Sequence, residues 1–393
     1  MHALFLIVFS NLLGFGIIIP LLPYYAEKFG ANPNEVTLLM ASYSLTQLIF
    51  SPILGRISDI YGRKKILVLC LIGSAISYFL LYFATNFVLV LFARSVAGIF
   101  GSTTAIANAY VTESTSSENR SKGMGLIGAA FGLGLVFGPV IGGYFGGGDI
   151  NNIDYKTPFF FASIIAIISC LLAYFMLTEP KKKNKQFISM NFLDSFKDLI
   201  DLFKIPALLF LIILSFLITF SFAGFETTFA LWTERAMSWA AKQTGYAFTF
   251  TALVVALIQG IFIGKLTKKF GEIKLLIISC FLMLLGLFLI TLSVQNLLYL
   301  TIALSILGIS VGLGNPSLNS LLSKNLNKNI IGTSFGVVQS VGSLARILSP
   351  LAMGNLFYFF GMNSPYKFAA FLMLISLFLF FYYFLFLKIK IKI

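Results

Sequence analysis

The sequence has few of the side chains that carry most enzyme chemistry. It contains one histidine, His2, and three cysteines, Cys70, Cys170 and Cys280, each in a separate apolar run. This excludes a histidine proton relay inside the protein and predicts neither a disulfide framework nor a metal site. The nucleotide-binding pattern G-x-x-x-x-G-K-[ST] does not occur, so ATP-driven pumping by this chain is not expected. We predict no enzymatic activity and no cofactor.

Charge is also scarce, and long apolar runs dominate the chain. Charged residues make up 11% and hydrophobic residues 58%, with a mean hydropathy of +0.94, whereas soluble domains are roughly 45–50% apolar. A membrane-spanning helix needs about 20 apolar residues. The sequence offers about twelve such runs, so we expect an all-α membrane protein. The predicted spans are centred near residues 13, 46, 75, 98, 134, 168, 218, 254, 283, 309, 342 and 376.

The basic residues predict how the chain is oriented. If the N-terminus lies inside, 21 of the 28 lysines and arginines fall in cytoplasmic segments, which is where positive residues are retained. Both termini are therefore predicted to face the cytoplasm. The net charge of +14 follows from this topology and from contact with anionic headgroups, and we expect no nucleic-acid partner.

Two motifs recur at nearly the same spacing, which indicates two related halves. Residues 264–274 repeat the pattern of 55–65 at an offset of 209, and residues 349–354 repeat that of 138–143 at an offset of 211. The predicted organisation is a six-helix bundle over 1–178, a cytoplasmic linker with an amphipathic helix over 179–204, and a second six-helix bundle over 205–393.

The most specific motif is the charged loop between the second and third spans. Gly55 and Gly62 permit a close turn, and Asp59 is placed to pair with Arg63 or to accept hydrogen bonds from a helix N-terminus. We predict that these four residues form a cytoplasmic gate; the alternative is that the basic residues only set topology. In the second copy Lys268 replaces the aspartate, so the second loop is expected to lack this contact.

The fifth span carries a glycine pattern. Gly134, Gly138 and Gly142 recur every four residues and line one helix face, where another helix can approach closely. Pro139 is expected to add a kink. The pattern indicates either ordinary tight packing or a seal against leakage along the transport pathway, and both interpretations stay open.

With these motifs the chain resembles the drug:proton antiporters of the major facilitator superfamily, which include tetracycline efflux proteins. The resemblance also rests on the segments Arg94–Gly98 and Gly14–Pro23. It implies two pseudo-symmetric six-helix bundles, a monomer in the bacterial inner membrane, and proton-coupled export of amphipathic small molecules. One departure is Asn11, which stands where tetracycline exporters carry an aspartate. This argues against tetracycline as the substrate, although Asn11 can still hydrogen-bond a ligand.

Ionisable groups inside the apolar runs are the main candidates for proton and substrate sites, because such groups are costly in hydrocarbon without a partner or cavity. They are Glu226, Arg94 and Arg346. Glu226 could instead be a structural partner of Arg346 or lie near the outer interface, and Glu113 is then the next candidate for proton coupling. The uncharged candidates are Asn11, Gln47, Gln259, Asn315 and Gln339. The candidate aromatic pocket residues are Tyr43, Phe131, Phe225 and Phe229.

Two other functions are compatible with these features. A transporter of a sugar or organic metabolite, with or without proton coupling, would share the fold and the loop motif. A membrane receptor or assembly factor that transports nothing is the alternative from a different class. The predicted partners of the exporter are a small-molecule substrate, protons and the lipid bilayer.

Overall fold

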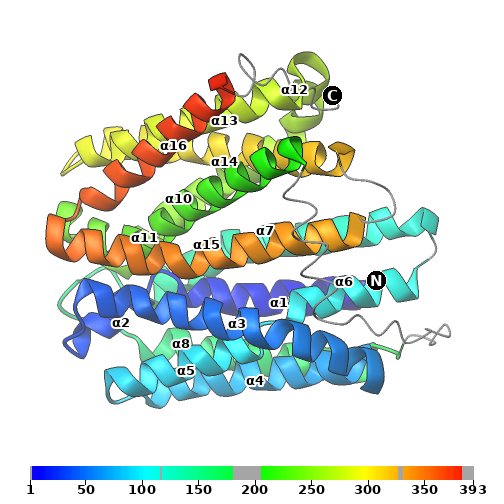
Figure 1. Cartoon of the computed structure of the whole chain (residues 1–393). Helices are drawn as coiled ribbons and strands as arrows, with labels where there is room; N and C mark the ends of the chain where they lie inside the picture. Colours follow the sequence, from blue (N-terminus) through cyan, green and yellow to red (C-terminus); the bar gives the residue numbers. More distant parts are fainter. Residues whose placement is uncertain (1, 116, 180–204, 326–330, 383–393) are drawn as a thin grey trace. The chain divides into compact units, whose positions relative to one another are not determined.

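The computed structural model describes residues 2–115, 117–179, 205–325 and 331–382, with backbone alone at 117–122, 325 and 331–338 (Figure 1). The regular elements of these residues are all helical. They are α1 (His2–Ile18), α2 (Leu22–Lys28), α3 (Pro33–Tyr61), α4 (Arg63–Phe83), α5 (Phe87–Ile99), α6 (Thr103–Ser114), α7 (Ser117–Gly146), α8 (Lys156–Met176), α10 (Pro206–Met237), α11 (Ala241–Leu257), the π-helix η1 (Ile258–Phe262), α12 (Ile263–Phe270), α13 (Glu272–Leu292), α14 (Leu297–Asn325), α15 (Ile331–Phe360) and α16 (Ser364–Tyr382).

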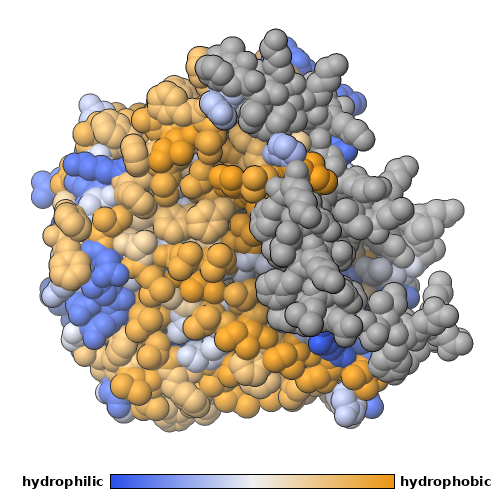
Figure 2. Space-filling model, in the orientation of Figure 1, coloured by the Kyte–Doolittle hydropathy of each residue, from blue (hydrophilic) through white to orange (hydrophobic). Residues whose placement is uncertain are grey.

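Every predicted span centre falls inside one of these helices, which confirms the all-α prediction. Within the described residues, ten helices are long and apolar enough to cross a membrane, or eleven if α1 and α2 form one bent span. The predicted span near residue 342 lies in α15. Figure 2 shows hydrophobic side chains over most of the described surface in this view. Such a surface is stable only in lipid.

The chain divides into two compact units. Unit 1 contains Met1–Gln186 and Ala230–Thr249, and unit 2 contains Phe187–Phe229 and Phe250–Ile393. Helices α10 and α11 therefore each begin in one unit and end in the other. The predicted division at 179–204 stays a prediction, and its proposed amphipathic helix lies outside the described residues after Glu179.

Local sequence explains where the first helices of unit 1 bend, begin and end. Pro20 has no N–H to donate, and α1 and α2 meet there with a bend of 42°. Helix α3 begins at a capping box in which Asn32 and Glu35 each accept from the other's backbone N–H. It ends at Gly62, whose φ of 110° suits glycine. This turn brings the last turn of α3 beside the first residue of α4, Arg63.

In unit 1, the glycine face of α7 packs directly on α1. A Cβ atom added to Gly138 would lie 2.6 Å from the Cα of Gly16, and one added to Gly134 would lie 2.6 Å from the Cβ of Leu12. Gly142 faces the backbone of Ile17 in the same way. The two helices approach closely because the three glycines share one face.

The matching contact in unit 2 joins α15 to α10. Ser349, which occupies the position of Gly138 in the repeat, donates from its hydroxyl to the Phe220 carbonyl at 2.6 Å. Gly224 faces Met353 one turn further along. In the same unit α13 packs on α14, where Ser279 and Ser310 each donate to the other's carbonyl at 2.9 and 2.8 Å. The sequence repeat is thus also a repeat of helix contacts.

We expect Gly138→Ala to destabilise unit 1, because its methyl group would collide with backbone that has no room to move. The free energy of unfolding should fall by about 1–3 kcal/mol, as for other overpacked sites. Gly132→Ala is the matched control: it lies on the same helix with nothing within 4 Å of an added Cβ. It should be neutral or stabilising by up to about 1 kcal/mol. Unfolding of the purified protein in detergent measures both, and equal effects would contradict the contact.

Candidate functional site

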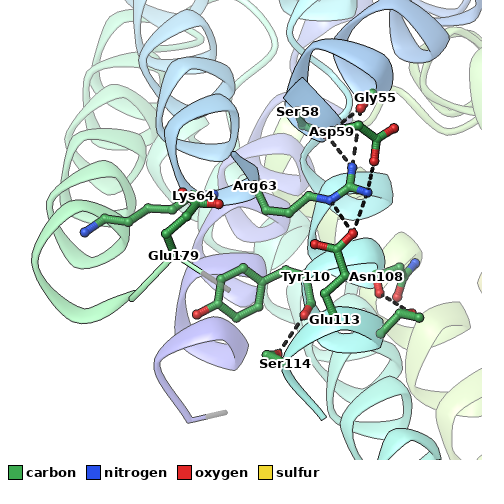
Figure 3. Close-up of polar contacts among 11 residues, drawn as sticks. Gly55, Ser58, Asp59, Arg63, Lys64, Asn108, Tyr110, Glu113, Ser114 and Glu179 are labelled. Atoms are coloured by element: carbon green, nitrogen blue, oxygen red, sulfur yellow. Dashed lines mark hydrogen bonds and ion pairs between the residues drawn. The ribbon is translucent and has the colours of Figure 1, made fainter. Parts of the chain in front are cut away.

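The loop motif forms an ion cluster around the buried Arg63, drawn in Figure 3. The guanidinium of Arg63 pairs with Asp59 one turn earlier and with Glu113 at the end of α6, where the Nη2 to Oε1 distance is 2.8 Å. It also donates to the Ser58 hydroxyl at 2.5 Å and the Gly55 carbonyl at 3.4 Å. Arg63 is 7% exposed. Its burial is possible because two carboxylates and two neutral acceptors satisfy its five donors.

Glu179 completes the cluster from the end of the first half. It follows α8 in the sequence, and its Oε1 accepts from the Lys64 backbone N–H at 3.3 Å (Figure 3). A carboxylate there stabilises the positive end of α4. The Gly62 backbone lies so close to this carboxylate that an added Cβ would be 2.5 Å from it. The backbone carbonyl of the preceding residue, Thr178, accepts a hydrogen bond from the Tyr110 hydroxyl at 2.7 Å.

The second copy of the loop carries an ion pair of reversed charge, which the sequence did not predict. Glu272 is the first residue of α13, as Arg63 is of α4, and the two are 209 positions apart. The Glu272 carboxylate pairs with Lys324 Nζ at 2.8 Å, and Lys324 stands 211 positions after Glu113. As expected, the second loop has no aspartate at the position of Asp59, which Lys268 occupies, and the Glu272 pair is a different contact. The carboxylate of this second pair follows Gly271 directly, at the start of α13.

In unit 1, Arg94 on α5 is buried behind aromatic rings. Its guanidinium carbon lies 4.6 Å from the centroid of the Tyr43 ring and 5.9 Å from that of Phe15. One terminal nitrogen approaches the Met40 sulfur at 3.9 Å, whereas Nε has no hydrogen-bond partner among the described residues. Arg94 is 2% exposed. Aromatic faces offset part of the cost of burying this charge.

The uncharged candidates of unit 1 differ in their surroundings. The Gln47 amide donates to the Gly101 carbonyl at 2.7 Å, at the break between α5 and α6. Gln47 therefore satisfies a carbonyl that no helix turn uses. The Asn11 side-chain oxygen is buried and has no partner in the described part of the chain. Phe131, by contrast, is 40% exposed on α7.

In unit 2, Glu226 lies on α10 beside the contact with α15 described above. The Arg346 guanidinium on α15 acts electrostatically on its carboxylate. Phe225 and Phe229 are buried, with their ring centroids 4.9 Å apart. The other polar candidates of this unit are exposed on separate helices, namely Gln259 in the π-helix, Asn315 on α14 and Gln339 on α15. The π-helix at Gln259 is a feature that hydrophobic periodicity could not indicate, although π-turns are frequent at functional sites.

Within the described residues, no group of three or more His, Cys, Asp or Glu side chains could hold a metal ion. The arrangement instead suits movement of a solute. Two related helix bundles, each with an ion-paired loop, and ionisable groups within apolar helices are the features of membrane transporters.

The chain belongs to the Major Facilitator Superfamily, which it matches over residues 4–350. It is a multi-pass membrane protein and a transporter of this superfamily. It is 30% identical over 350 residues to the class H tetracycline resistance protein of Pasteurella multocida, which covers 88% of this chain and 86% of the relative. It is also 30% identical over 387 residues to multidrug resistance protein 2 of Bacillus subtilis, covering 95% and 93% of the two chains.

Solved structures show the same fold. The human organic anion transporter MFSD10 (TETRAN) matches with a TM-score of 0.72 and 25% identity, over 96% of this chain and 98% of that one. The nucleoside transporter NupG matches with a TM-score of 0.80 over 99% of both chains. Its identity is 14%, so this likeness concerns the fold alone.

We expect Arg63→Gln to destabilise unit 1, because it leaves the Asp59 and Glu113 carboxylates without their shared cation. The free energy of unfolding should fall by about 1–3 kcal/mol, less than for a fully buried pair since both carboxylates are partly exposed. Arg56→Gln removes the same charge from an exposed site in the same loop and should change stability by less than about 0.5 kcal/mol. Denaturant unfolding in detergent compares the two variants, and similar losses would show that only net loop charge matters.

Proposed function

We propose that this transporter is a proton-coupled exporter of amphipathic small molecules that works by alternating access. The observation that carries the proposal is the Glu226 carboxylate within a membrane-spanning helix, in the field of Arg346. An ionisable group at such depth is costly unless it serves a polar pathway or exchanges a proton. The relatives named for tetracycline and multidrug resistance support export as the direction of transport.

The polar candidates of unit 2 support a central pathway. Gln259 and Asn315 are exposed, yet they lie well inside the candidate spans Ala241–Phe270 and Leu297–Lys324, and Gln339 is exposed in the third turn of α15. Amide side chains at that depth are unfavourable against lipid tails and favourable along a hydrated cavity. We therefore assign them, with Glu226 and Arg346, to the lining of the substrate pathway, where amides supply hydrogen bonds to neutral parts of a substrate.

The gate assignment follows from the charge cluster. Asp59, Arg63 and Glu113 join three helices through contacts that are strong while dry and weak once water enters. Such a cluster can hold one end of the pathway closed and release it after a small separation. By the distribution of basic residues this end faces the cytoplasm, as do both chain termini, and the membrane is the bacterial inner membrane.

A second candidate, transport of an organic metabolite that carries negative charge, is favoured by Arg94. This guanidinium is buried with no carboxylate partner among the described residues, and an anionic substrate group could complete it. The likeness to a structure titled as an organic anion transporter agrees with this candidate. Anionic compounds therefore belong in any substrate panel for this protein.

The proposal predicts that Glu226→Gln abolishes substrate-driven proton flux, because an amide keeps the shape of the side chain and cannot exchange a proton. The assay records internal pH of proteoliposomes when lipophilic cations, neutral drugs or organic anions are added. We expect flux with wild type and at least about a tenfold loss in the variant, the scale of losing a protonatable group from a coupled step.

Asp149→Asn is the control for this experiment, since it removes a carboxylate from the loop between α7 and α8. It should leave the proton flux unchanged. Flux retained in Glu226→Gln would remove that carboxylate from coupling and direct attention to Glu113. Substrate uptake without proton flux in wild type would contradict coupling and favour a facilitated transporter of metabolites.

A further inference from the structure

The end of unit 1 opposite the charged loop carries a second set of polar contacts, built from hydroxyl groups. Tyr24 on α2 places its hydroxyl 2.8 Å from that of Thr244 on α11, and Thr244 lies 2.8 Å from the hydroxyl of Thr233 on α10. The Tyr24 hydroxyl is also 3.2 Å from the Trp239 carbonyl in the loop between α10 and α11. We call Tyr24, Thr233 and Thr244 the hydroxyl cluster. All three are buried, at 3%, 0% and 0% exposure.

The hydroxyl cluster attaches a distinct piece of chain to the first half of the protein. Thr233, Trp239 and Thr244 all belong to the segment Ala230–Thr249, whose helices continue into unit 2. Tyr24 belongs to the N-terminal helices. The cluster therefore ties the ends of α10 and α11 to α2. A separation of this segment from α2 would break these hydrogen bonds.

Further contacts beside the hydroxyl cluster, mostly to backbone atoms, keep the same segment close to α7. The Lys242 N–H donates to the Gly147 carbonyl at 3.1 Å, and the Thr249 hydroxyl donates to the Val136 carbonyl at 3.0 Å. A Cβ added to Gly143 would lie 2.7 Å from the Ala241 carbonyl oxygen. At the rim, Arg235 and Glu27 form an ion pair of 3.1 Å.

The loop that presents Trp239 is held in a costly conformation. Ser238 has a φ of 54°, which is unfavourable for a residue other than glycine. Its N–H donates to the Glu234 carbonyl at 3.0 Å and ends α10. The turn directs the Trp239 carbonyl to the Tyr24 hydroxyl, so the contact with Tyr24 helps to offset this cost.

The next residue provides a natural comparison. Tyr25 is also buried, at 4% exposure, but its hydroxyl donates to the Leu81 and Ala84 carbonyls at 3.0 and 2.9 Å, both at the end of α4. Its ring packs against Tyr155 at 4.9 Å. Burial raises the pKa of Tyr155 to about 12, so its hydroxyl stays protonated and donates to the Tyr24 carbonyl at 3.3 Å. Tyr25 thus attaches α2 to α4, whereas Tyr24 reaches the segment Ala230–Thr249.

We propose that the hydroxyl cluster is the lock that closes this end of the transport pathway, and that the Tyr24 hydroxyl sets the balance between its closed and open forms. The proposal rests on the alternating-access part of the proposed function. It differs from the charge cluster at the other end in its chemistry, because neutral hydroxyl groups release and re-form hydrogen bonds without any cost of separating charge.

The tryptophans of the chain can report opening of this lock by their fluorescence. Its two tryptophans, Trp232 and Trp239, both lie in the segment that the hydroxyl cluster attaches. Trp232 is fully buried. Quenching of intrinsic fluorescence by acrylamide therefore reports opening of this segment, with no added label. The measurement uses the full-length protein in lipid nanodiscs, without substrate and without a proton gradient.

Tyr24→Phe keeps the ring and removes the hydroxyl, so we expect the ratio of open to closed protein to rise by about fivefold, the effect of losing one net hydrogen bond. The quenching constant should rise with it. Tyr25→Phe is the matched control and should leave quenching at the wild-type value while lowering thermal stability. If Tyr24→Phe does not fold, Thr244→Val serves instead, because it removes the hydroxyl that Tyr24 and Thr233 share.

Equal quenching in wild type and Tyr24→Phe, or an equal rise in both tyrosine variants, would overturn the proposal. The test is separate from that of the proposed function. A protein that moves no proton or substrate can still show the Tyr24-dependent quenching, which would uphold the lock and reject the exporter. Proton-coupled transport together with equal quenching in the two tyrosine variants would uphold the exporter and reject the lock.

Discussion

The structure depends on one constraint, which is that hydrocarbon supplies no hydrogen bonds to a polar group. The described chain therefore consists of helices, which satisfy their backbones internally, and several of its buried polar side chains carry specific partners. Arg63 is enclosed by carboxylates, and Gln47 serves the carbonyl exposed at the break between α5 and α6. Arg94, which has aromatic faces and no acidic partner among the described residues, departs from this rule and is for that reason a functional candidate.

The internal repeat shows how one scaffold solves the same packing problem twice. Gly138 lets α7 approach α1 by having no side chain, and Ser349 lets α15 approach α10 by donating to its backbone. The ion pairs are repeated as well, with Arg63 and Glu113 replaced by Glu272 and Lys324. The two pairs occupy corresponding positions with their charges exchanged, because the attraction between two charges is the same whichever helix carries the positive one. The exchange also places Glu272 at the positive end of α13, where a carboxylate is favourable.

The two ends of unit 1 differ in their buried contacts, which are an ion cluster around Arg63 at one end and a hydroxyl cluster, with the Arg235 and Glu27 pair at its rim, at the other. The Arg63 cluster is ionic and becomes weak when water enters, because the effective dielectric constant rises. The hydroxyl cluster is neutral and loses little when its groups are hydrated, since water replaces each hydrogen bond. Each end is thus held by several modest contacts that can break in turn, which suits a protein that changes conformation repeatedly.

The sequence by itself determined the helical class, the position of every predicted span and the existence of two related halves, because these follow from the length of apolar runs and from repeated motifs. It also indicated the Asp59 and Arg63 pair, because the glycines of the loop permit a close turn that brings these two residues together. Only the tertiary structure decided that Glu113, 50 positions away, shares Arg63, that Glu179 reaches the start of α4, and that Tyr24 reaches Thr244. These contacts join distant helices, and their partners depend on helix rotation and depth, which composition and periodicity do not specify.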